Sequence, residues 1–343
     1  MLRHIPNREE MKMKSWLIDG GSGELVCNDV ATPEAAADEL LVKMHTAALN
    51  RGEFIRGHGL HQPGVMKPAG MEGAGEVIQV GSAVTGFKVG DAVMGRPMQG
   101  FSEIATWKPG ETILKPAELS WEEAAGASLA YWVAFDMVAR SATGAANDDA
   151  GEIGAGDWVL ITGVSSGVGV ASMQIAKARG AKVIGTSSSQ AKLDRLAKLG
   201  LDVGVCVRGP GFVDAVMKAT DGKGVKLLVN NVGGSIFEDG MKSLAFKGRL
   251  ATVGYVDGVL SAKIDLELLH AKRLRVFGVS NKMRPLAERA MTVADFARDI
   301  VPLMAKRTLV PVIDKVFGFD QLAAARDYME SNAQVGKIVI KTA

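Results

Sequence analysis

Glycine and serine dominate residues 163–169, which read GVSSGVG. The preceding residues 158–162 are rich in bulky apolar side chains, and a helical pattern that ends at Arg179-Gly180 follows. A buried strand, a glycine-rich turn and a helix in this order place backbone N–H groups and a helix N-terminus where they can bind a pyrophosphate. We therefore predict a dinucleotide site. The residues expected to contact the phosphates are Ser165, Ser166, Gly167, Val168 and Gly169.

The turn departs from a strict G-x-G-x-x-G motif, because Val164 and Ser166 hold two of the glycine places. Ser166 is small enough to allow close approach of the backbone, and its hydroxyl can donate a hydrogen bond to a phosphate oxygen. The alternative is a serine-rich turn that only caps the helix at 168–179. The strand before the turn, the helix after it and five further strands favour the dinucleotide site.

The residues after the second strand indicate which dinucleotide is bound. Sites that prefer NAD place an Asp or Glu about 20 residues past the glycines, on the ribose 2′-OH. Residues 185–192 read GTSSSQAK, so hydroxyls (Ser187, Ser188) and a cation (Lys192) stand there without a carboxylate. These groups suit a 2′-phosphate. Arg208, after the third strand, is a second candidate cation. We predict NADPH rather than NADH.

Another interpretation of residues 185–192 makes Ser189 a helix N-cap and leaves Lys192 solvated. The capping role and the 2′-phosphate role are compatible.

The nicotinamide end of the cofactor is expected at the loops after the later strands, because ligands lie beyond the carboxyl ends of such strands. The residues predicted there are Asn231, Gly254, Tyr255, Val279 and Ser280.

The elements that must position these residues fill a chain of 343 residues, a length typical of two domains. Short apolar runs between Gly-Asp turns predict an all-β module before residue 116, with strands that include 15–18, 39–48 and 100–105. Residues 116–139 have a helical pattern, with Ser120 and Glu123 as a capping box.

The second half of the chain alternates strands with helices, which predicts a doubly wound parallel six-stranded sheet of the α/β class. Its strands are predicted at 158–162, 182–186, 204–207, 226–230, 249–253 and 274–279. Residues 142–156 form a long loop before the sheet. From residue 284 a helix, a strand at 310–314, a helix at 320–331 and a strand at 336–341 are expected.

Composition narrows the class of protein. Apolar residues make up 47% of the chain and the net charge is +2, which fits a soluble globular protein and not a nucleic-acid-binding one. Two cysteines, Cys27 and Cys206, cannot form a disulfide framework. The most apolar window, 129–139, is short and contains Asp136, so no membrane span is expected. The polar N-terminus, with a tail at 1–13, does not resemble a secretory leader, and we expect a cytoplasmic protein.

Seven short motifs, in order and spacing, resemble the medium-chain dehydrogenase/reductase superfamily and, more narrowly, its zinc-independent quinone oxidoreductase (zeta-crystallin-like) branch. The motifs are ALNR (48–51), GMEGAG (70–75), GDAV (90–93), LITG (160–163), GVG (167–169), NVGG (231–234) and GK (336–337). The resemblance implies a GroES-like β-rich catalytic domain over 1–129, a Rossmann NADPH-binding domain over 130–282, and a return segment at 283–343 that completes the catalytic domain. It also implies a homodimer, formed through the last strands of the dinucleotide domain.

Zinc-dependent relatives carry a His before the Glu of the GMEGAG motif and a Cys near the place of Asn50. Here Met71 and Asn50 occupy those places, and a thioether and an amide cannot replace imidazole and thiolate in a zinc site. His58 and His61 have no third ligand nearby. We predict that the protein binds no metal.

The resemblance places Asn50 beside the nicotinamide, where its amide would orient the carboxamide or a substrate carbonyl; a turn-forming Asn is the alternative. Tyr131 is a second catalytic candidate. Tyr131, Tyr255, Met71 and Trp107 are possible pocket walls, and core packing is the alternative for each. The implied reaction is hydride transfer to a quinone, or to the β-carbon of an alkene conjugated to a carbonyl. This reaction requires the protein to align cofactor and acceptor, to exclude water and to donate hydrogen bonds to the developing oxyanion. The sequence indicates no specific residue as proton donor.

The same residues allow three other interpretations. Short-chain dehydrogenases share a T-G-x-x-x-G-x-G turn but need a Tyr with a Lys four residues later. The three tyrosines are followed at that distance by Phe135, Val259 and Asn332, which rejects this family. An enoyl thioester reductase of the same superfamily, and a non-catalytic NADPH-binding module like the lens crystallins, stay open. The small-molecule electron acceptor is not determined by the sequence.

Overall fold

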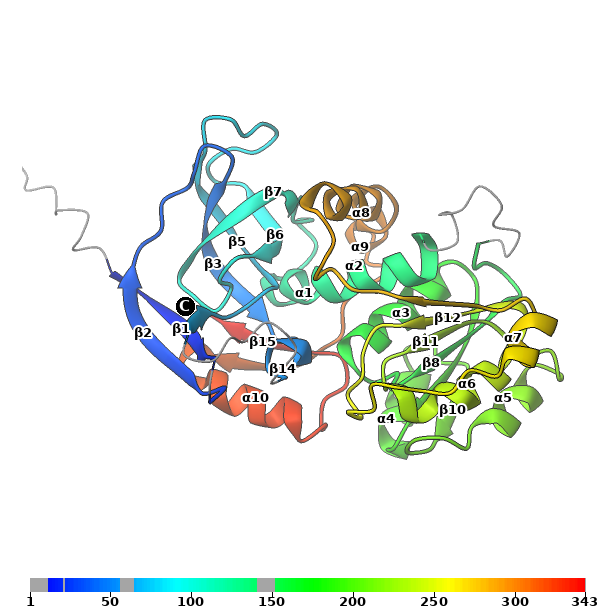
Figure 1. Cartoon of the computed structure of the whole chain (residues 1–343). Coiled ribbons are helices and arrows are strands. Elements are labelled where there is room, and N and C mark those ends of the chain that lie inside the picture. The colour runs from blue at the N-terminus through cyan, green and yellow to red at the C-terminus, as the bar shows by residue number, and fades with distance from the viewer. Residues whose placement is uncertain (1–11, 21, 56–64, 141–151, 343) are drawn as a thin grey trace, which may run out of the picture. The chain divides into compact units, whose positions relative to one another are not determined.

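A computed structural model describes residues 12–20, 22–55, 65–140 and 152–342. The chain divides into two compact units, which are drawn in Figure 1. Unit 1 comprises Met1–Leu129 and Arg289–Ala343, and unit 2 comprises Ala130–Glu288. The contacts thus place the unit limits at 129/130 and 288/289. The domain limits predicted from the sequence, 129/130 and 282/283, stay predictions.

Unit 2 contains a six-stranded parallel sheet with the strand order β10-β9-β8-β11-β12-β13 (Figure 1). Its strands are β8 (Trp158–Thr162), β9 (Lys182–Ser187), β10 (Val203–Cys206), β11 (Val225–Asn230), β12 (Leu244–Thr252) and β13 (Arg275–Gly278). The predicted doubly wound sheet is therefore confirmed. Because β8 and β11 are neighbours in space but not in sequence, the winding reverses between them, and ligands bind at such a point in this class of fold.

Helices connect the strands of unit 2. They are α2 (Leu129–Phe135), a π-helical turn (Asp136–Arg140), α3 (Gly167–Ala178), α4 (Gln190–Ala197), α5 (Val213–Ala219), a 3₁₀ turn (Gly234–Ile236), α6 (Phe237–Lys242) and α7 (Leu266–Ala271). Central strand residues such as Leu160, Ile184, Leu228 and Leu250 are fully buried. The strands read as nearly continuous apolar runs because helices pack on parallel sheets of this kind.

Unit 1 contains a six-stranded sheet with the order β14-β15-β3-β5-β6-β7, in which β3 also pairs with β7. A smaller sheet has the order β2-β1-β4. The strands are β1 (Lys12–Asp19), β2 (Leu25–Ala31), β3 (Leu40–Ala48), β4 (Met66–Pro68), β5 (Gly73–Val80), β6 (Ala92–Pro97), β7 (Ile104–Leu114), β14 (Ile313–Gly318) and β15 (Lys337–Lys341). The β15–β3 pairing joins the C-terminal segment to the N-terminal strands, as the return segment of the predicted fold requires.

The helices of unit 1 follow the predicted order. They are a 3₁₀ turn (Arg51–Glu53), α1 (Trp121–Gly126), α8 (Leu286–Asp299), α9 (Val301–Ala305), a 3₁₀ turn (Phe319–Gln321) and α10 (Leu322–Glu330), with α8 beginning just before the unit limit. The capping box is confirmed: Ser120 Oγ accepts from the Glu123 N–H at 3.1 Å, and a Glu123 carboxylate oxygen accepts from the Ser120 N–H at 2.9 Å. None of the described helices is long and apolar enough to cross a membrane.

Two predicted strands are displaced from those of the structure. The strand expected at 310–314 shares only its last two residues with β14. Only the last residues of the strand expected at 100–105 belong to β7, which runs on through Pro109 and Gly110 to Leu114. β2 was not predicted, because its sequence LVCNDVA has no alternation of apolar and polar residues and the strand is mostly exposed at the edge of its sheet. An exposed edge strand needs no alternation of apolar residues, so the pattern carries little signal.

Candidate functional site

The glycine-rich turn lies between β8 and α3, with Ser166 as the N-cap of α3. Ser166 Oγ accepts a hydrogen bond from the Gly169 N–H at 3.0 Å, so the capping role is real and the hydroxyl proton remains available to an acceptor. Ser165, Gly167 and Val168 are partly exposed around the first turn of the helix. Capping and phosphate binding are therefore compatible in this turn.

Gly169 allows the helix to approach the turn closely. A Cβ atom at this position would lie 2.6 Å from Gly163 O and 2.7 Å from Val164 O. Gly163 itself adopts a φ of +61°, in the left-handed region that glycine favours. These two glycines let the start of α3 lie close against the turn, the geometry in which a helix N-terminus meets a pyrophosphate. The residues of the turn thus fit the phosphates of a dinucleotide.

Val164 stands in one of the missing glycine places, and the structure shows how the fold accommodates it. The Val164 side chain is fully buried, and a Cβ atom at Gly185 would lie 2.6 Å from Val164 Cγ1. The valine therefore occupies space that a glycine of β9 leaves free. This compensation could not be predicted from the sequence, because Val164 lies in the turn after β8 and Gly185 lies on β9.

The predicted 2′-phosphate site lies where β9 and β10 end. Ser187 is buried at the end of β9, Ser188 is exposed, and Lys192 lies half-buried in the first turn of α4. Ser187 is paired in register with Cys206, so the exposed Arg208, two residues later, follows the neighbouring strand at the same edge. Ser189 is the N-cap residue of α4 and makes no side-chain capping bond. The structure thus brings the two candidate cations to adjacent strand ends.

The residues predicted for the nicotinamide end follow β11, β12 and β13. Asn231 donates its side-chain N–H to Thr162 O at 2.9 Å and its backbone N–H to Thr162 Oγ1 at 3.2 Å, which ties the end of β11 to the end of β8. After β12, Gly254 lies against Asn231 O, which a Cβ atom would approach to 3.2 Å, and Tyr255 is partly exposed. All three residues lie at the carboxyl edge of the sheet.

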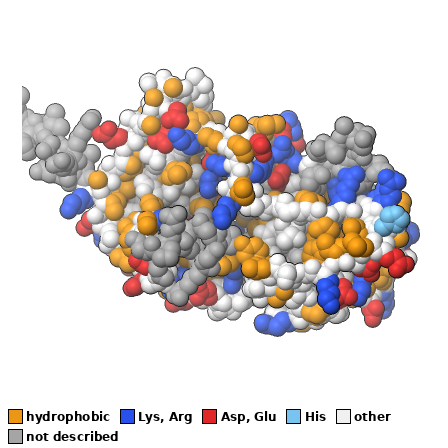
Figure 2. Space-filling view, viewed as in Figure 1, with side chains coloured by type: hydrophobic (Ala, Val, Ile, Leu, Met, Phe, Trp, Pro, Cys, Tyr) orange, Lys and Arg blue, Asp and Glu red, His pale blue; other side chains and the backbone are white. Residues whose placement is uncertain are grey.

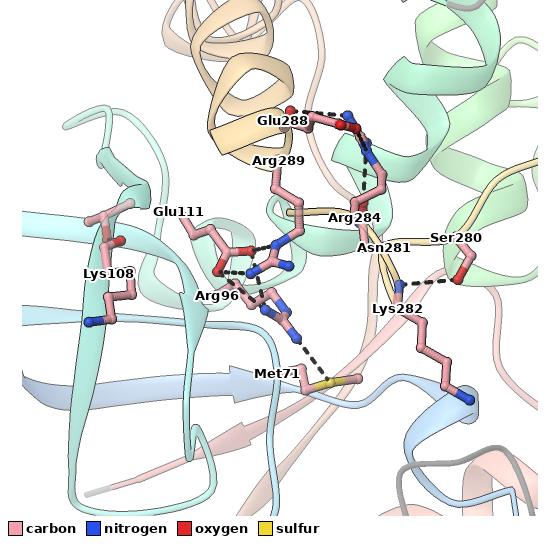
Figure 3. A network of polar contacts seen from close by, with 11 residues as sticks. Met71, Arg96, Lys108, Glu111, Ser280, Asn281, Lys282, Arg284, Glu288 and Arg289 are labelled. Atoms are coloured by element: carbon pink, nitrogen blue, oxygen red, sulfur yellow. Dashed lines mark hydrogen bonds and ion pairs between the residues drawn. The ribbon is translucent and has the colours of Figure 1, made fainter. Parts of the chain in front are cut away.

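Val279 and Ser280 follow β13 at the same edge. The Val279 N–H donates to Thr252 O at 2.9 Å, and Ser280 Oγ accepts from the Lys282 N–H at 3.2 Å (Figure 3). Every predicted cofactor residue thus lies at one edge of the sheet in unit 2. That these residues contact a cofactor stays a prediction.

Asn230 shapes the loop after β11, and the sequence did not single it out as a site residue. Its fully buried side chain accepts from the N–H groups of Val232 and Gly233, each at 3.0 Å, and donates to Gly233 O at 3.0 Å. Gly233 has a φ of +135°, and a Cβ atom there would lie 2.0 Å from an oxygen of Asp257. The N-x-x-G spacing of Asn230 and Gly233 is therefore required by the loop itself.

In unit 1, Asn50 belongs to a buried polar cluster. Its side-chain N–H groups donate to Glu53 Oε1 at 3.2 Å and Glu72 Oε2 at 3.0 Å, and its oxygen accepts from Lys337 Nζ at 2.9 Å. Lys337 Nζ also contacts Glu72 Oε2 at 2.6 Å and Leu49 O at 2.9 Å. Both donors of the Asn50 amide are thus used within unit 1. The predicted contact of this amide with nicotinamide or substrate stays a prediction.

Glu53 is a member of the same cluster that the sequence did not reveal. Burial raises the pKa of its carboxyl from 4.5 to about 7, against the opposing effects of hydrogen bonds from Asn50 and the Gly70 N–H and of the Lys337 charge. Glu53 and Glu72 are 3% and 0% exposed, and Lys337 is 4% exposed. With Glu53 protonated, one buried carboxylate faces one ammonium group and the cluster carries no net charge.

We expect the stability of the protein to fall as pH rises from about 4.5 to about 7, in part because of Glu53. In that range the folded carboxyl keeps a proton that the unfolded chain loses, so the folded state binds more protons and higher pH favours unfolding. The contribution is of the order of 3 kcal/mol, at about 1.4 kcal/mol per pKa unit. Unfolding free energies measured by urea titration across this range should show it.

Glu53→Gln is the matched variant for this experiment, because it keeps the shape of the side chain without its titration. The difference in unfolding free energy between variant and wild type should shift in favour of the variant as pH rises to 7 and beyond. A difference that is constant with pH would mean that Glu53 is not protonated in the folded state.

The remaining residues singled out by the sequence lie in or near the cores. Tyr131 is 1% exposed, and its hydroxyl donates to Gln174 Oε1 of α3 at 2.5 Å, inside unit 2. Trp107 is fully buried in the core of unit 1, in agreement with the core-packing interpretation. The catalytic role of Tyr131 stays a prediction, and its hydroxyl has a protein partner.

Met71 is partly buried beside an ion cluster of unit 1 (Figure 3). Its sulfur lies 3.8 Å from Nη2 of Arg96, whose other terminal nitrogen contacts Glu111. Arg289 contacts the same carboxylate, with Nε 2.7 Å from Glu111 Oε1. This cluster could not be predicted from the sequence, because its members are far apart along the chain.

Within the described residues, no three His, Cys, Asp or Glu side chains come close enough together to hold a metal ion. His58 and His61 lie outside the residues that the structure describes. The prediction of a zinc-free site therefore continues to depend on the residue types at Asn50 and Met71.

Comparisons with known families match both halves of the chain. Residues 36–134 match the alcohol dehydrogenase GroES-like domain, and residues 167–296 match the zinc-binding dehydrogenase family. The first match lies in the β-rich part of unit 1 and extends slightly beyond it, and the second begins at the first residue of α3.

Individual relatives are similar over nearly the whole chain. Acryloyl-coenzyme A reductase of Metallosphaera sedula is 25% identical, over 96% of this chain and 100% of its own length. Quinone oxidoreductase of Rattus norvegicus is 26% identical, over 91% of this chain and 92% of its own. A crystal structure of an NAD-dependent alcohol dehydrogenase superimposes with a TM-score of 0.81 at 26% identity, over 96% of this chain and 100% of that one.

Proposed function

Because the chain belongs to the medium-chain dehydrogenase/reductase superfamily, we propose that it is an NADPH-dependent reductase that works without zinc. Its acceptor is a quinone or an α,β-unsaturated carbonyl compound. The observation that carries the proposal is the glycine-rich turn, in which Gly163 and Gly169 have no side chains. This turn leads into the N-terminus of α3, at the point where the winding of the sheet reverses.

The residues of unit 2 fit a nicotinamide dinucleotide. The N–H groups after Ser166 would hold the pyrophosphate, Ser187, Ser188, Lys192 and Arg208 the ribose phosphate, and the loops after β11, β12 and β13 the nicotinamide. When bound, this cofactor supplies the hydride. The protein aligns the acceptor, excludes water and stabilises the negative charge that forms on the acceptor's oxygen.

The experiment that tests this function is an acceptor screen with the purified protein, following the loss of NADPH absorbance in the presence of a metal chelator. We expect turnover with quinones or enones, and no loss of rate on chelation. Tight NADPH binding without oxidation by any acceptor would instead indicate a non-catalytic binding module. A rate that disappears with the chelator would contradict zinc independence.

The second candidate function is reduction of an enoyl thioester. The relative from Metallosphaera sedula supports it, since acryloyl-coenzyme A is an unsaturated thioester and the two chains align over 96% of this one. The same acceptor screen distinguishes the two, if enoyl-coenzyme A compounds are included beside quinones and simple enones. A kcat/KM at least tenfold higher for the thioester would favour this second function.

The preference for NADPH leads to a prediction about two cations. Replacing Lys192 and Arg208 together by Ala should weaken NADPH binding by about 10- to 100-fold, because a hydrogen bond to a charged group is worth about 1.5–3 kcal/mol. NADH binding should change little. Fluorescence titration with both cofactors checks this, and it is needed because the similar solved structure is of an NAD-dependent enzyme.

Lys198→Ala is the control for this pair, because Lys198 is an exposed cation at the other end of α4. It should leave both affinities unchanged. If wild-type protein binds NADH as tightly as NADPH, or if the double variant loses both to the same extent, the 2′-phosphate assignment is wrong.

We also propose that the protein is a homodimer. β13 is an edge strand of the sheet in unit 2, and apolar side chains of the neighbouring segment are exposed, among them Val256 at 54%, Leu260 at 78% and Leu266 at 72%. Figure 2 shows apolar side chains gathered over the region of β12 and α7. Such a patch beside an unpaired edge favours association with a second copy, which light scattering would detect as a doubled mass.

A further inference from the structure

Asp257 joins the two loops of unit 2 that follow β11 and β12. Its Oδ2 accepts a hydrogen bond from the Ser235 N–H of the first loop at 2.9 Å, and its backbone N–H donates to Val232 O of that loop at 3.0 Å. Its Oδ1 accepts from the Val259 N–H at 2.9 Å, and Val259 O in turn accepts from the Gly234 N–H at 3.0 Å. The carboxylate thus joins the loops directly at Ser235 and also fixes the turn that presents Val259 O.

The first loop approaches this carboxylate closely at Gly233. A Cβ atom at Gly233 would lie 2.0 Å from Asp257 Oδ1. Burial raises the pKa of the Asp257 carboxyl, but the hydrogen bonds from Ser235 and Val259 together outweigh it and hold the pKa below its ordinary value of 3.8. The side chain is therefore ionised at neutral pH, and hydrogen bonds to a charged acceptor are stronger than those between neutral groups.

The two loops lie at the carboxyl ends of neighbouring strands, beside the point between β8 and β11 where the winding of the sheet reverses. They carry Asn231, Gly254 and Tyr255, which the proposed function assigns to the nicotinamide. Asn231 is held by Thr162 at the end of β8, at 2.9 and 3.2 Å. Asp257 holds the residues that come after Asn231, so the position of the first loop depends on both contacts.

We propose that Asp257 is a positioning residue for the nicotinamide half of NADPH, which holds the loops after β11 and β12 at the spacing that this half requires. This inference rests on the proposed function. Loops that are already ordered need no free energy to become ordered on binding, and they present the nicotinamide to the acceptor in one orientation. Without the carboxylate, the cost of ordering the loops is subtracted from the affinity for NADPH.

The adenosine half of the cofactor should not depend on Asp257. Its 2′-phosphate is assigned to the ends of β9 and β10, which lie on the other side of β8 in the sheet. A ligand that contains only this half therefore separates a positioning role of Asp257 from a general loss of structure in unit 2.

The test titrates the purified protein with NADPH and with adenosine 2′,5′-bisphosphate, which keeps the adenine and the 2′-phosphate but has no nicotinamide. Asp257→Ala should weaken NADPH binding by about tenfold or more, the factor that corresponds to one hydrogen bond to a charged group, and leave the affinity for adenosine 2′,5′-bisphosphate unchanged. Asp257→Asn keeps one oxygen acceptor and should show the same selectivity with a smaller loss. A purely structural role would lower thermal stability and leave the ratio of the two dissociation constants unchanged.

Asp202→Ala is the matched control, because Asp202 also joins two segments of unit 2, but at the opposite edge of the sheet. Its Oδ2 accepts from the Val183 N–H at 2.7 Å and from Lys177 Nζ at 2.8 Å. This variant should lose stability and keep the wild-type affinity for both ligands.

Unchanged NADPH affinity in both Asp257 variants, or equal losses for the two ligands, would overturn the role of Asp257 and leave the proposed function intact. Selective loss of NADPH affinity without turnover of any acceptor would support the role of Asp257 and contradict only the proposed reductase activity. A wild-type protein that does not bind NADPH would overturn both.

Discussion

Replacing Lys337 by Met should destabilise unit 1 by about 3–5 kcal/mol, the range measured when one partner of a buried ion pair is removed. Lys337 Nζ is the centre of three hydrogen bonds, to Glu72 Oε2, Asn50 Oδ1 and Leu49 O. Methionine fills a similar volume but donates nothing. Glu72, which has no exposed surface, would then lose the ammonium group that lies 2.6 Å from its Oε2.

Urea unfolding at pH 7 measures this loss. Lys341→Met is the matched control, because Lys341 lies on the same strand with its side chain exposed, and it should change stability by less than about 0.5 kcal/mol. The double variant Lys337→Met/Glu72→Gln should recover part of the loss, since the buried carboxylate that has lost its ammonium partner is then absent. A loss below about 1 kcal/mol for Lys337→Met would contradict this expectation. It would mean that the desolvation of the two charges costs about as much free energy as their attraction contributes.

Much of the fold could be predicted from the sequence, because most strands and helices have a recognisable pattern within their own residues. Each parallel strand of unit 2 is a short apolar run bounded by turn residues, so β8 and β11 were found at or within one residue of their ends. The alternation of these runs with helical segments then required a doubly wound sheet. The edge strand β2 was missed because an exposed edge strand need not show such a pattern.

The candidate site could be predicted only in part. The turn residues around Ser166 were found because a strand, a glycine turn and a helix are contiguous in sequence. The Asn50 cluster was not found, since Lys337 Nζ reaches Asn50 Oδ1 across 287 positions of the chain. Asn50 and the motifs that contain Glu72 and Lys337 were noted from the resemblance, but no local rule pairs a Glu on one strand with a Lys on another. The same holds for Arg96 and Glu111, and for Val164 and Gly185.

Gly169→Ala should weaken NADPH binding by at least about tenfold, or roughly 1.4 kcal/mol, and lower stability by about 1–3 kcal/mol. The added Cβ atom would meet Gly163 O and Val164 O at 2.6 and 2.7 Å, and both are backbone atoms that no rotamer change can move. Either the turn or the first turn of α3 must shift. A shift of either separates the Ser166 cap from the Gly169 N–H and moves the N–H groups that are proposed to hold the pyrophosphate.

Gly154→Ala is the control for this variant, because a Cβ atom there has its nearest neighbour, Arg179 O, at 4.0 Å. Fluorescence titration with NADPH and thermal unfolding should both leave Gly154→Ala close to the wild type. The two readouts also separate two accounts of the turn. If Gly169→Ala loses stability but binds NADPH with wild-type affinity, the turn serves only to cap α3, and the cofactor must bind elsewhere. If Gly169→Ala loses both stability and NADPH affinity while Gly154→Ala keeps both, cofactor binding depends on the close approach of the turn and the helix. The displaced N–H groups then account for both effects.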